Sequence, residues 1–416
     1  MVLCVVVLHP QHLVCKDRLI MLICRRWLAF SLKGQCRSLS LSASRRIIMP
    51  AWVIDKYGDN NVLRFSKNVF LPIIHFPNEV IIKVHAAALN PIDISMRGGY
   101  GITTLALKRD FLDLSEKGKE FPLILGRDVS GEIMECGLAV NLFKPGDQVW
   151  AAIPPWKQGS LAEFVVVSAN EVAHKPRSLE HVEAASIPYV AETAWSAIVN
   201  TGGLNKDNSA KKRQLTATTP MDSHESTSLG TSSNPCAPRL RAPIETNLLS
   251  LEALSVLILG GSGGVGTIAI QMLKAWGAHV TVTCSYDAKS LVRDLGADDV
   301  VDYTAEPPEK QLQSLPKFDL ILDNIGGETE KWAPSLLKPW SGAKFVTLVT
   351  PFLNNADRLG AVDGMLQSGA TLGCKMIKIR AVVEKVFTFA EVPKAFEKVE
   401  QGHARGKTVV TVAKHL

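Results

Sequence analysis

The sequence predicts an α/β protein in which a β-rich domain is followed by a domain with a doubly wound parallel sheet. Three observations predict this class. The first part of the chain has short strand-like segments separated by turns, the second part alternates strand and helix patterns, and a glycine-rich turn joins a strand to a helix in the second part. With 416 residues, 46% of them hydrophobic, the chain is long enough to form two cores.

The β-rich part extends over residues 50–187. EVIIKVHAAAL (79–89) is rich in β-branched residues, GRDVSGEIMECG (126–137) alternates apolar and polar residues, and KPGDQVWAAI (144–153) places a Pro-Gly-Asp turn before another strand. This part is therefore expected to form the β-rich domain.

The second part extends over residues 188–385. Strand-like segments alternate with amphipathic helical segments from VLILGGSGGVGTIAIQMLKAWGAHVTVTCS (256–285) to AKFVTLVT (343–350). Such alternation predicts parallel strands covered by helices. Within it, residues 206–254 are rich in Ser, Thr, Pro and Asn without sustained periodicity, so we expect a disordered insert or a translated intron.

The first 48 residues have the composition of a mitochondrial transit peptide. Residues 1–50 hold eight Lys and Arg against one acidic residue, Asp17, and the segment is also rich in Ser. A wrongly chosen start codon and a secretory signal are the alternatives. No apolar run approaches the roughly 20 residues that cross a bilayer, so the mature protein is expected to be soluble.

The rest of the chain does not have the charge of a nucleic-acid-binding protein. The formal net charge is +6 and the leader alone accounts for +7, so the remainder is −1. Four of the eight cysteines lie in the leader, and the others, Cys136, Cys236, Cys284 and Cys374, are far apart. Neither a disulfide framework nor a cysteine zinc site is predicted.

A glycine-rich turn predicts a dinucleotide site. Gly261, Gly263 and Gly266 form the pattern G-x-G-x-x-G between the strand 256–260 and a helix, as in a Rossmann-type domain. There the turn needs residues without Cβ, and the helix N-terminus attracts the pyrophosphate. The predicted cofactor-binding residues in this turn are Ser262, Gly263, Gly264, Val265 and Gly266.

The end of the next strand favours NADPH over NADH. NAD enzymes place an acidic residue there to bind the ribose 2′-hydroxyl, whereas this sequence has Cys284 and Ser285. A Ser285 hydroxyl can donate a hydrogen bond to a 2′-phosphate, and Lys289 can add positive charge. Asp287 argues against this interpretation, and Lys289 is alternatively an ordinary solvated helix residue.

The order of these motifs resembles the zinc-free quinone oxidoreductase branch of the medium-chain dehydrogenase/reductase superfamily over residues 50–416, apart from the insert. The segments that carry the resemblance are LNPIDISMRGGY (89–100), LGRDVSG (125–131), DNIGG (323–327) and GHARGKTV (402–409). The resemblance implies a GroES-like β-rich catalytic domain at 50–187, completed by 386–416, and a Rossmann NADPH-binding domain at 188–385.

The resemblance also implies chemistry without a metal. Zinc-bearing relatives have Cys, His and an acidic ligand at the places of Asn90, Arg127 and Asp128, and neither Asn nor Arg is a ligand of that kind. Hydride transfer to a quinone or an α,β-unsaturated carbonyl is the expected reaction. The expected catalytic residues are Tyr100, Asn90 and Asp93; Tyr100 is alternatively a plain pocket-wall or turn residue, and Asp93 a local capping residue.

The remaining cofactor-binding residues come from the resemblance alone. Loops on the nicotinamide side, a residue near the adenine and the C-terminal loop supply Asn324, Leu348, Tyr303, His403, Ala404 and Arg405. Arg405 and Lys407 are alternatively solvated turn charges.

One segment departs from the family pattern. Between TLGCKMIKIR (371–380) and VFTFAEVPKAF (386–396) the family has a further strand and helix, which this chain lacks. The far edge of the parallel sheet is therefore expected to be unpaired, and part of a common dimer contact to be missing, which weakens the case for NADPH binding and for a homodimer.

Two functional hypotheses follow. The first is an NADPH-dependent reductase of quinones or enones in the mitochondrial matrix, with ubiquinone metabolism as a suitable setting. The second follows from the segments PAWVIDKYG (50–58) and IPPWKQGS (153–160), which resemble reticulon-interacting members of the branch. It is a non-catalytic or weakly catalytic protein that binds a reticulon-type membrane protein, with outer-membrane association as the alternative location. Fold alone does not separate the two.

Overall fold

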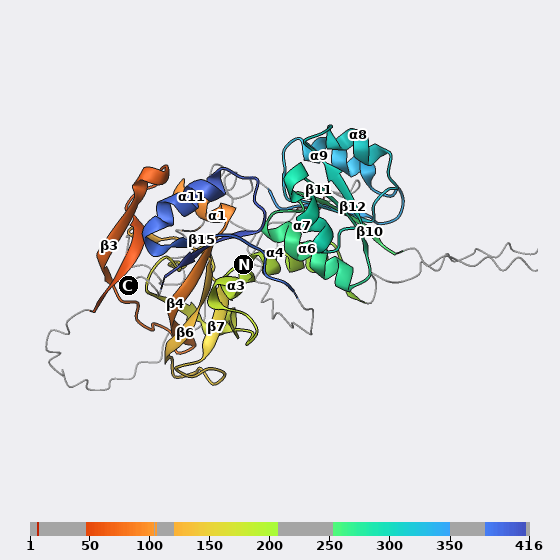
Figure 1. The fold of residues 1–416 in the computed structure, drawn as a ribbon. Coiled ribbons are helices and arrows are strands. Elements are labelled where there is room, and N and C mark those ends of the chain that lie inside the picture. Colours follow the sequence, from red (N-terminus) through yellow and green to blue (C-terminus); the bar gives the residue numbers. More distant parts are fainter. Residues whose placement is uncertain are drawn as a thin grey trace, which may run out of the picture.

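Three β-sheets organise the part of the chain that the structure describes (Figure 1). This computed structural model describes residues 47–103, 105, 120–206, 253–349 and 379–412, together with the backbone of residues 6 and 7. The predicted insert 206–254 lies outside the described residues except at its two ends, and so does most of the segment at 371–380.

The strands are β1 (Val6–Val7), β2 (Ile48–Ile54), β3 (Leu63–Phe70), β4 (Glu79–Leu89), β5 (Leu123–Ile124), β6 (Asp128–Cys136), β7 (Gln148–Ala152), β8 (Phe164–Ser168), β9 (Val172–His174), β10 (Ser255–Leu259), β11 (His279–Cys284), β12 (Asp299–Asp302), β13 (Leu320–Asp323), β14 (Lys344–Thr347), β15 (Val383–Thr388) and β16 (Lys407–Thr411). The α-helices are α1 (Pro91–Arg97), α3 (His181–Ala185), α4 (Pro188–Trp195), α6 (Gly264–Ala275), α7 (Lys289–Asp294), α8 (Pro308–Gln313), α9 (Thr329–Trp332) and α11 (Val392–Glu400). A π-helical turn, η3 (Ser196–Thr201), continues α4, and the 3-10 turn η4 (Tyr286–Ala288) precedes α7.

The parallel sheet has the strand order β14-β13-β10-β11-β12, with β10 in the middle. Alternate residues of β10 face opposite sides: Val256 and Ile258 pack in the core that includes α4 and α6, whereas Leu257 and Leu259 pack in the core beneath α8 and α9. Because helices cover both faces, the strand is apolar on both sides and shows no alternation. Figure 1 shows this helix-covered sheet as a separate lobe.

The far edge of the parallel sheet differs from the prediction. Residues Val6 and Val7, from the predicted leader, form β1, which pairs antiparallel with β14. The expectation that this edge is unpaired is therefore wrong over these two positions. The predicted leader also reaches the first structured element of the other lobe, since β2 begins at Ile48.

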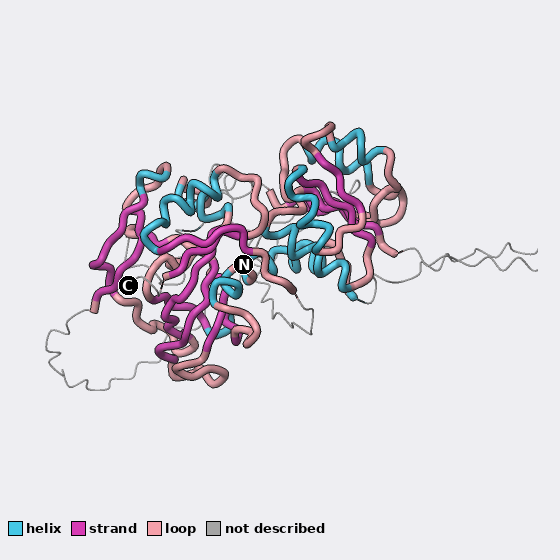
Figure 2. The backbone as a smooth tube through the Cα atoms, in the orientation of Figure 1, coloured by secondary structure: helices cyan, strands magenta, loops and turns pink. Residues whose placement is uncertain are grey.

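The second large sheet belongs to the β-rich part and takes in the C-terminal end of the chain. Its order is β15-β16-β4-β6-β7-β9, with β8 also paired to β4. Strand β16 lies between β15 and the long strand β4, so residues 407–411 are internal to this sheet. Figure 2 shows that strands predominate in this lobe, whereas helices surround the parallel sheet in the other.

Helices pack on the β-rich lobe and at the junction of the two lobes. Helix α11 packs against α1 on the β-rich lobe, and α4 packs against α6 at the junction of the two lobes (Figure 1). None of the helices in the described part of the chain combines the length and the apolar character that crossing a bilayer requires. The predicted fold class, a β-rich domain with a doubly wound parallel sheet, is confirmed.

Candidate active site

The glycine turn lies between β10 and α6, as the sequence predicts. Gly260, which lies outside the three-glycine pattern, has a left-handed backbone conformation, with φ +78°. Gly261 and Gly266 are needed for close packing, because a Cβ on Gly261 would lie 2.8 Å from Val282 Cβ and one on Gly266 would lie 2.5 Å from the Gly261 carbonyl oxygen. The pattern therefore identified the turn but missed the residue with the left-handed conformation.

Gly263 has a different role. It is the N-cap of α6, and a Cβ there would come no closer than 3.9 Å to the protein, at the Gly260 carbonyl oxygen. Space on that side of the turn is what a pyrophosphate needs to approach the backbone. The N–H groups of the first turn of α6, which include those of Gly264, Val265 and Gly266, carry the positive end of the helix dipole. These residues fit a dinucleotide phosphate.

The C-terminal loop reaches the glycine turn and the strand ends beside it. The Gly406 N–H donates to the Ser262 carbonyl oxygen at 3.0 Å. Tyr303 Oη lies 3.1 Å from His403 Nδ1, and His403 has φ +50°. Three predicted cofactor-binding residues, Ser262, Tyr303 and His403, are thus gathered at one end of the parallel sheet, and Ala404 follows His403 in the chain.

Charges near the predicted ribose position are paired. Arg405 Nη2 lies 3.2 Å from Asp287 Oδ2, with both side chains about half exposed. Lys289 Nζ lies 3.0 Å from Asp302 Oδ2 and stands over the Tyr286 ring. Lys289 is therefore an ion-pair partner in this structure and not a freely solvated helix residue.

The end of the second strand is neutral. Cys284 is fully buried at the end of β11, and burial raises the pKa of its thiol to about 11. Ser285 follows as the half-buried N-cap of η4. The nearest acidic residue along the sequence is Asp287, and Asp302 pairs with Cys284 across the sheet; both carboxylates are engaged by cations.

Asn324 and Leu348 follow neighbouring strands at their carboxyl ends. Asn324 Nδ2 lies 3.4 Å from the Gly260 carbonyl oxygen, and Asn324 Oδ1 is buried without a hydrogen-bond partner among the described residues. The Leu348 N–H donates to the Asp323 carbonyl oxygen at 2.9 Å. The carboxyl ends of parallel strands are where such sheets bind ligands.

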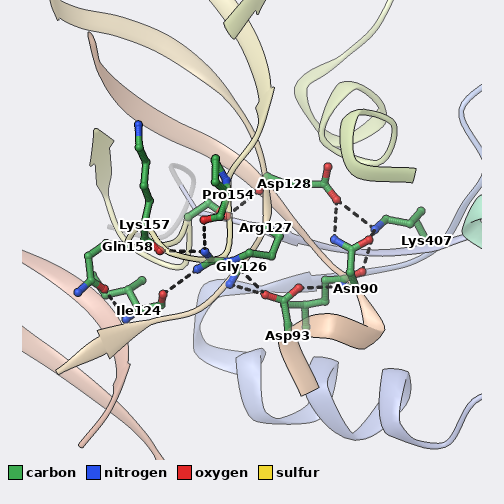
Figure 3. Close-up of polar contacts among 12 residues, drawn as sticks. Asn90, Asp93, Ile124, Gly126, Arg127, Asp128, Pro154, Lys157, Gln158 and Lys407 are labelled. Carbon is green, nitrogen blue, oxygen red and sulfur yellow. Dashed lines mark hydrogen bonds and ion pairs between the residues drawn. The ribbon is translucent and has the colours of Figure 1, made fainter. Parts of the chain in front are cut away.

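Asn90 belongs to a buried polar network with Asp128 and Lys407 (Figure 3). Asn90 Nδ2 donates to Asp128 Oδ2 at 2.8 Å, and the Asn90 Oδ1 accepts a hydrogen bond from Lys407 Nζ. Lys407 Nζ also lies 3.1 Å from Asp128 Oδ2 and 2.9 Å from the Leu89 carbonyl oxygen. Lys407 is 5% exposed, so its interpretation as a solvated turn charge is wrong.

This network touches the glycine turn. A Cβ on Gly264 would lie 2.9 Å from Lys407 Cδ and 3.0 Å from Val190 Cγ1, so the lysine stem lies against the N-terminus of α6. The polar groups of the β-rich lobe and the predicted phosphate site of the other lobe are therefore in direct contact.

Asp93 forms a second buried cluster with Arg127 (Figure 3). Its carboxylate accepts hydrogen bonds from the Asn90 and Gly126 N–H groups, both at 2.8 Å, and lies 3.6 Å from Arg127 Nε. Burial raises the pKa of Asp93, whereas the positive charge of Arg127 acts to lower it. The Arg127 guanidinium also donates to three backbone carbonyl oxygens, those of Ile124, Pro154 and Lys157. Asp93 thus caps α1 and pairs locally.

Tyr100 lies just beyond α1 and is half buried. Its N–H donates to the Ser95 carbonyl oxygen at 2.9 Å, which fixes the turn after the helix. The turn also contains Gly99, with φ +94°. This backbone geometry places Tyr100 at the end of the element that Asn90 and Asp93 begin.

Helix α4 contributes two groups that the sequence did not single out. The Tyr189 N–H donates to Asp128 Oδ1 at 2.7 Å, so α4 begins on the buried network. Burial raises the pKa of Glu192 to about 7, and the Asp128 charge acts in the same direction. The only sequence signal was Pro188 at the first helical position, which marks a helix start and no chemistry.

Comparison with known proteins agrees with this architecture. Residues 76–177 match the family "Alcohol dehydrogenase GroES-like domain", and residues 264–398 match the family "Zinc-binding dehydrogenase". The expected GroES-like domain is thereby confirmed.

Individual relatives cover nearly the whole chain. The chain is 65% identical to "NAD(P)H oxidoreductase RTN4IP1, mitochondrial" of Danio rerio over 94% of its own length and 98% of the relative's. It is 31% identical to the chloroplastic "NADPH-dependent alkenal/one oxidoreductase" of Arabidopsis thaliana over 93% of its length and 87% of the relative's. A solved structure, the quinone oxidoreductase from Coxiella burnetii, is 26% identical with a TM-score of 0.60, covering 88% of this chain and all of that one.

A helix-covered parallel sheet with a glycine turn, joined to a GroES-like domain, is the fold of oxidoreductases that use a nicotinamide dinucleotide. The chain belongs to the medium-chain dehydrogenase/reductase family of oxidoreductases, in the group that contains the mitochondrial relative from Danio rerio.

Proposed function

We propose that this protein is an NADPH-dependent oxidoreductase that reduces a quinone or an α,β-unsaturated carbonyl without zinc. The observation that carries the proposal is the contact between the glycine turn and the buried Asn90–Asp128–Lys407 network at Gly264. This contact joins a phosphate-binding turn to polar groups of the GroES-like domain. The names of the Arabidopsis thaliana and Coxiella burnetii relatives, an alkenal/one and a quinone oxidoreductase, support the two substrate classes.

The preference for NADPH is supported by the neutral end of β11. A 2′-phosphate beside Cys284 and Ser285 would meet no carboxylate at those positions, and Arg405 and Lys289 stand nearby in ion pairs that a phosphate could join. The predicted cofactor-binding residues in this proposal are Ser262 to Gly266, Ser285, Tyr303, Asn324, Leu348 and His403 to Arg405.

The residues at the three zinc-ligand positions do not fit a zinc ion. Asn90 directs its amide N–H at Asp128, Arg127 places a cation where a neutral imidazole would be needed, and Asp128 is held by Asn90 and Lys407. These groups bind one another, so we assign them a positioning role. We propose that the reaction uses an acceptor that is already electron-poor.

A bound NADPH would supply the hydride. The contribution of this chain would be to hold the acceptor and to polarise it. Tyr100, at the end of α1, is proposed to line the acceptor side, whereas Asn90 and Asp93 fix the start of that helix.

The proposed location is the mitochondrial matrix. The basic, acid-poor leader and the mitochondrial relative from Danio rerio support import. Ubiquinone metabolism is the proposed setting, and a homodimer is the proposed assembly. Binding to a reticulon-type membrane protein is the second candidate function, favoured by the resemblance of residues 50–58 and 153–160 to reticulon-interacting members of the branch.

Turnover of both nucleotides by the purified full-length chain tests the proposal. With a panel of quinones and enones, NADPH should be oxidised with a kcat/KM about tenfold or more above that of NADH, since a charge-assisted hydrogen bond contributes roughly 1.5–3 kcal/mol. Metal analysis should find no stoichiometric zinc. Tight NADPH binding without oxidation above background would favour the binding function, and one zinc per chain would contradict the metal-free reaction.

A further inference from the structure

Tyr189 is a buried phenol whose hydroxyl has no hydrogen-bond partner among the described residues. The residue is 5% exposed and its Oη is fully covered. Native proteins seldom leave a buried hydroxyl unpaired, because it has lost its water without a replacement. An unpaired donor beside a candidate active site is therefore a place where a ligand would supply the missing acceptor.

The backbone of Tyr189 is fixed to the buried network. Asp128 Oδ1 accepts the Tyr189 N–H at 2.7 Å, while Asp128 Oδ2 accepts from Asn90 and Lys407. The next residue, Val190, lies against the start of α6, since a Cβ on Gly264 would be 3.0 Å from Val190 Cγ1. Tyr189 thus stands where the GroES-like lobe, α4 and the glycine turn meet.

The neighbouring donors are already used. Lys407 Nζ is directed at three acceptors, and the Thr193 hydroxyl donates to the Tyr189 carbonyl oxygen at 2.8 Å. The Asn90 amide donates to Asp128. Burial and the charges of Asp93 and Asp128 raise the pKa of Tyr189, so its phenol keeps its proton and can act as a donor.

We propose that the Tyr189 hydroxyl donates a hydrogen bond to the carbonyl oxygen of the hydride acceptor. This inference rests on the proposed reductase function. Hydride would leave the nicotinamide C–H bond of bound NADPH, which is oxidised to NADP⁺, and add to the electrophilic carbon of a quinone or enone. A new C–H bond then forms on the acceptor and its π-electron pair moves to the carbonyl oxygen. The phenol stabilises that developing negative charge and keeps its proton, and the oxyanion then takes a proton from water.

Replacement of Tyr189 by Phe tests the inference, because it removes only the hydroxyl. The full-length Tyr189→Phe protein should reduce quinones with a kcat about 100-fold below wild type, the typical loss of one donor to a developing oxyanion. Its NADPH dissociation constant should not rise and its melting temperature should not fall, because the deleted hydroxyl has no hydrogen-bond partner among the described residues. Tyr189→Met, which also lacks the hydroxyl, should show the same loss of kcat, and agreement between the two variants guards against a folding defect in one of them.

Tyr57→Phe is the matched control. The Tyr57 hydroxyl donates to Glu120, so its loss should lower the melting temperature and leave kcat unchanged. If wild type is active and Tyr189→Phe matches it, the role of Tyr189 is overturned while the reductase function stands. If wild type reduces none of the quinones and enones with NADPH, the reductase function and the role of Tyr189 fail together. A loss of kcat in Tyr100→Phe but not in Tyr189→Phe would assign the donor to Tyr100.

Discussion

At the scale of single residues, Lys407 shows how burial changes the meaning of a charge. In the sequence it follows a Gly-His-Ala-Arg-Gly turn and resembles an ordinary solvated cation. In the structure it is 5% exposed and ion-paired with the fully buried Asp128. A buried ion pair adds little net stability, but removal of one partner leaves the other charge buried and unpaired.

Lys407→Met should therefore destabilise the protein by about 3–5 kcal/mol, because Asp128 keeps its buried charge without a cation. Urea unfolding at neutral pH measures the change. Lys331→Met is the control: Lys331 pairs with Glu328 with its side chain 71% exposed, and its loss should cost under about 1 kcal/mol. A Lys407→Met protein within about 1 kcal/mol of wild type would contradict a charged pair at this position.

At the scale of elements, the turn between β10 and α6 separates two uses of glycine. Gly266 packs against the turn that precedes it, while Gly263 leaves space outside the helix N-terminus. The G-x-G-x-x-G pattern contains all three glycines. It does not tell which of them are needed for packing within the protein and which leave space for a ligand.

Alanine substitutions should distinguish these roles. Gly263→Ala should cost under about 1 kcal/mol of stability, since Ala is only a poorer N-cap, yet weaken NADPH binding at least about tenfold by crowding the pyrophosphate. Gly266→Ala should cost about 1–3 kcal/mol and also weaken binding, because its Cβ would lie 2.5 Å from the Gly261 carbonyl oxygen. Urea unfolding and nucleotide titration measure both effects. Equal binding by Gly263→Ala and wild type would argue against a pyrophosphate at this turn.

At the scale of the whole molecule, the chain returns to its first domain. Strand β16 pairs with β4 some 300 residues earlier in sequence, and α3 packs on the same sheet. Between them, His85 on β4 and His181 on α3 stack with ring centroids 4.3 Å apart, and the Ser130 hydroxyl lies 2.8 Å from His181 Nδ1.

This histidine pair should make folding sensitive to acid. Burial lowers the pKa of both rings from 6.5, that of His181 to about 4, with His85 and Lys175 acting in the same direction on His181. As the pH falls, the unfolded chain therefore binds these protons at a higher pH than the folded chain does. This contribution to stability is complete above pH 6.5 and is lost as the pH falls toward 4.

Urea unfolding between pH 7 and pH 4 tests this expectation. Wild type should lose stability relative to His181→Asn as the pH falls, because the variant no longer has the ring that must stay neutral. Replacement of the exposed His75 by Asn serves as control and should follow wild type. Parallel curves for wild type and His181→Asn would show that the stacked pair does not resist protonation.

Much of the fold was readable from the sequence because it depends on local periodicity. The apolar run 256–259, the glycine turn and the amphipathic helix after it each need only neighbouring residues to be recognised, and the predicted α/β class is confirmed. The glycine pattern singled out Ser262 and the resemblance singled out Tyr303, His403 and Arg405; the structure brings these residues to one end of the parallel sheet.

The polar network was decided by tertiary structure alone. Whether Lys407 is solvated, whether Asp93 caps a helix, and whether the Tyr189 hydroxyl has a partner depend on residues that are distant in sequence and meet only after folding. Burial and pairing are properties of a three-dimensional environment. The sequence by itself therefore determined the class of fold and the glycine turn. The tertiary structure decided which side chains meet around Asp128, where the first residues of β6, β16 and α4 and the N-cap of α1 come together.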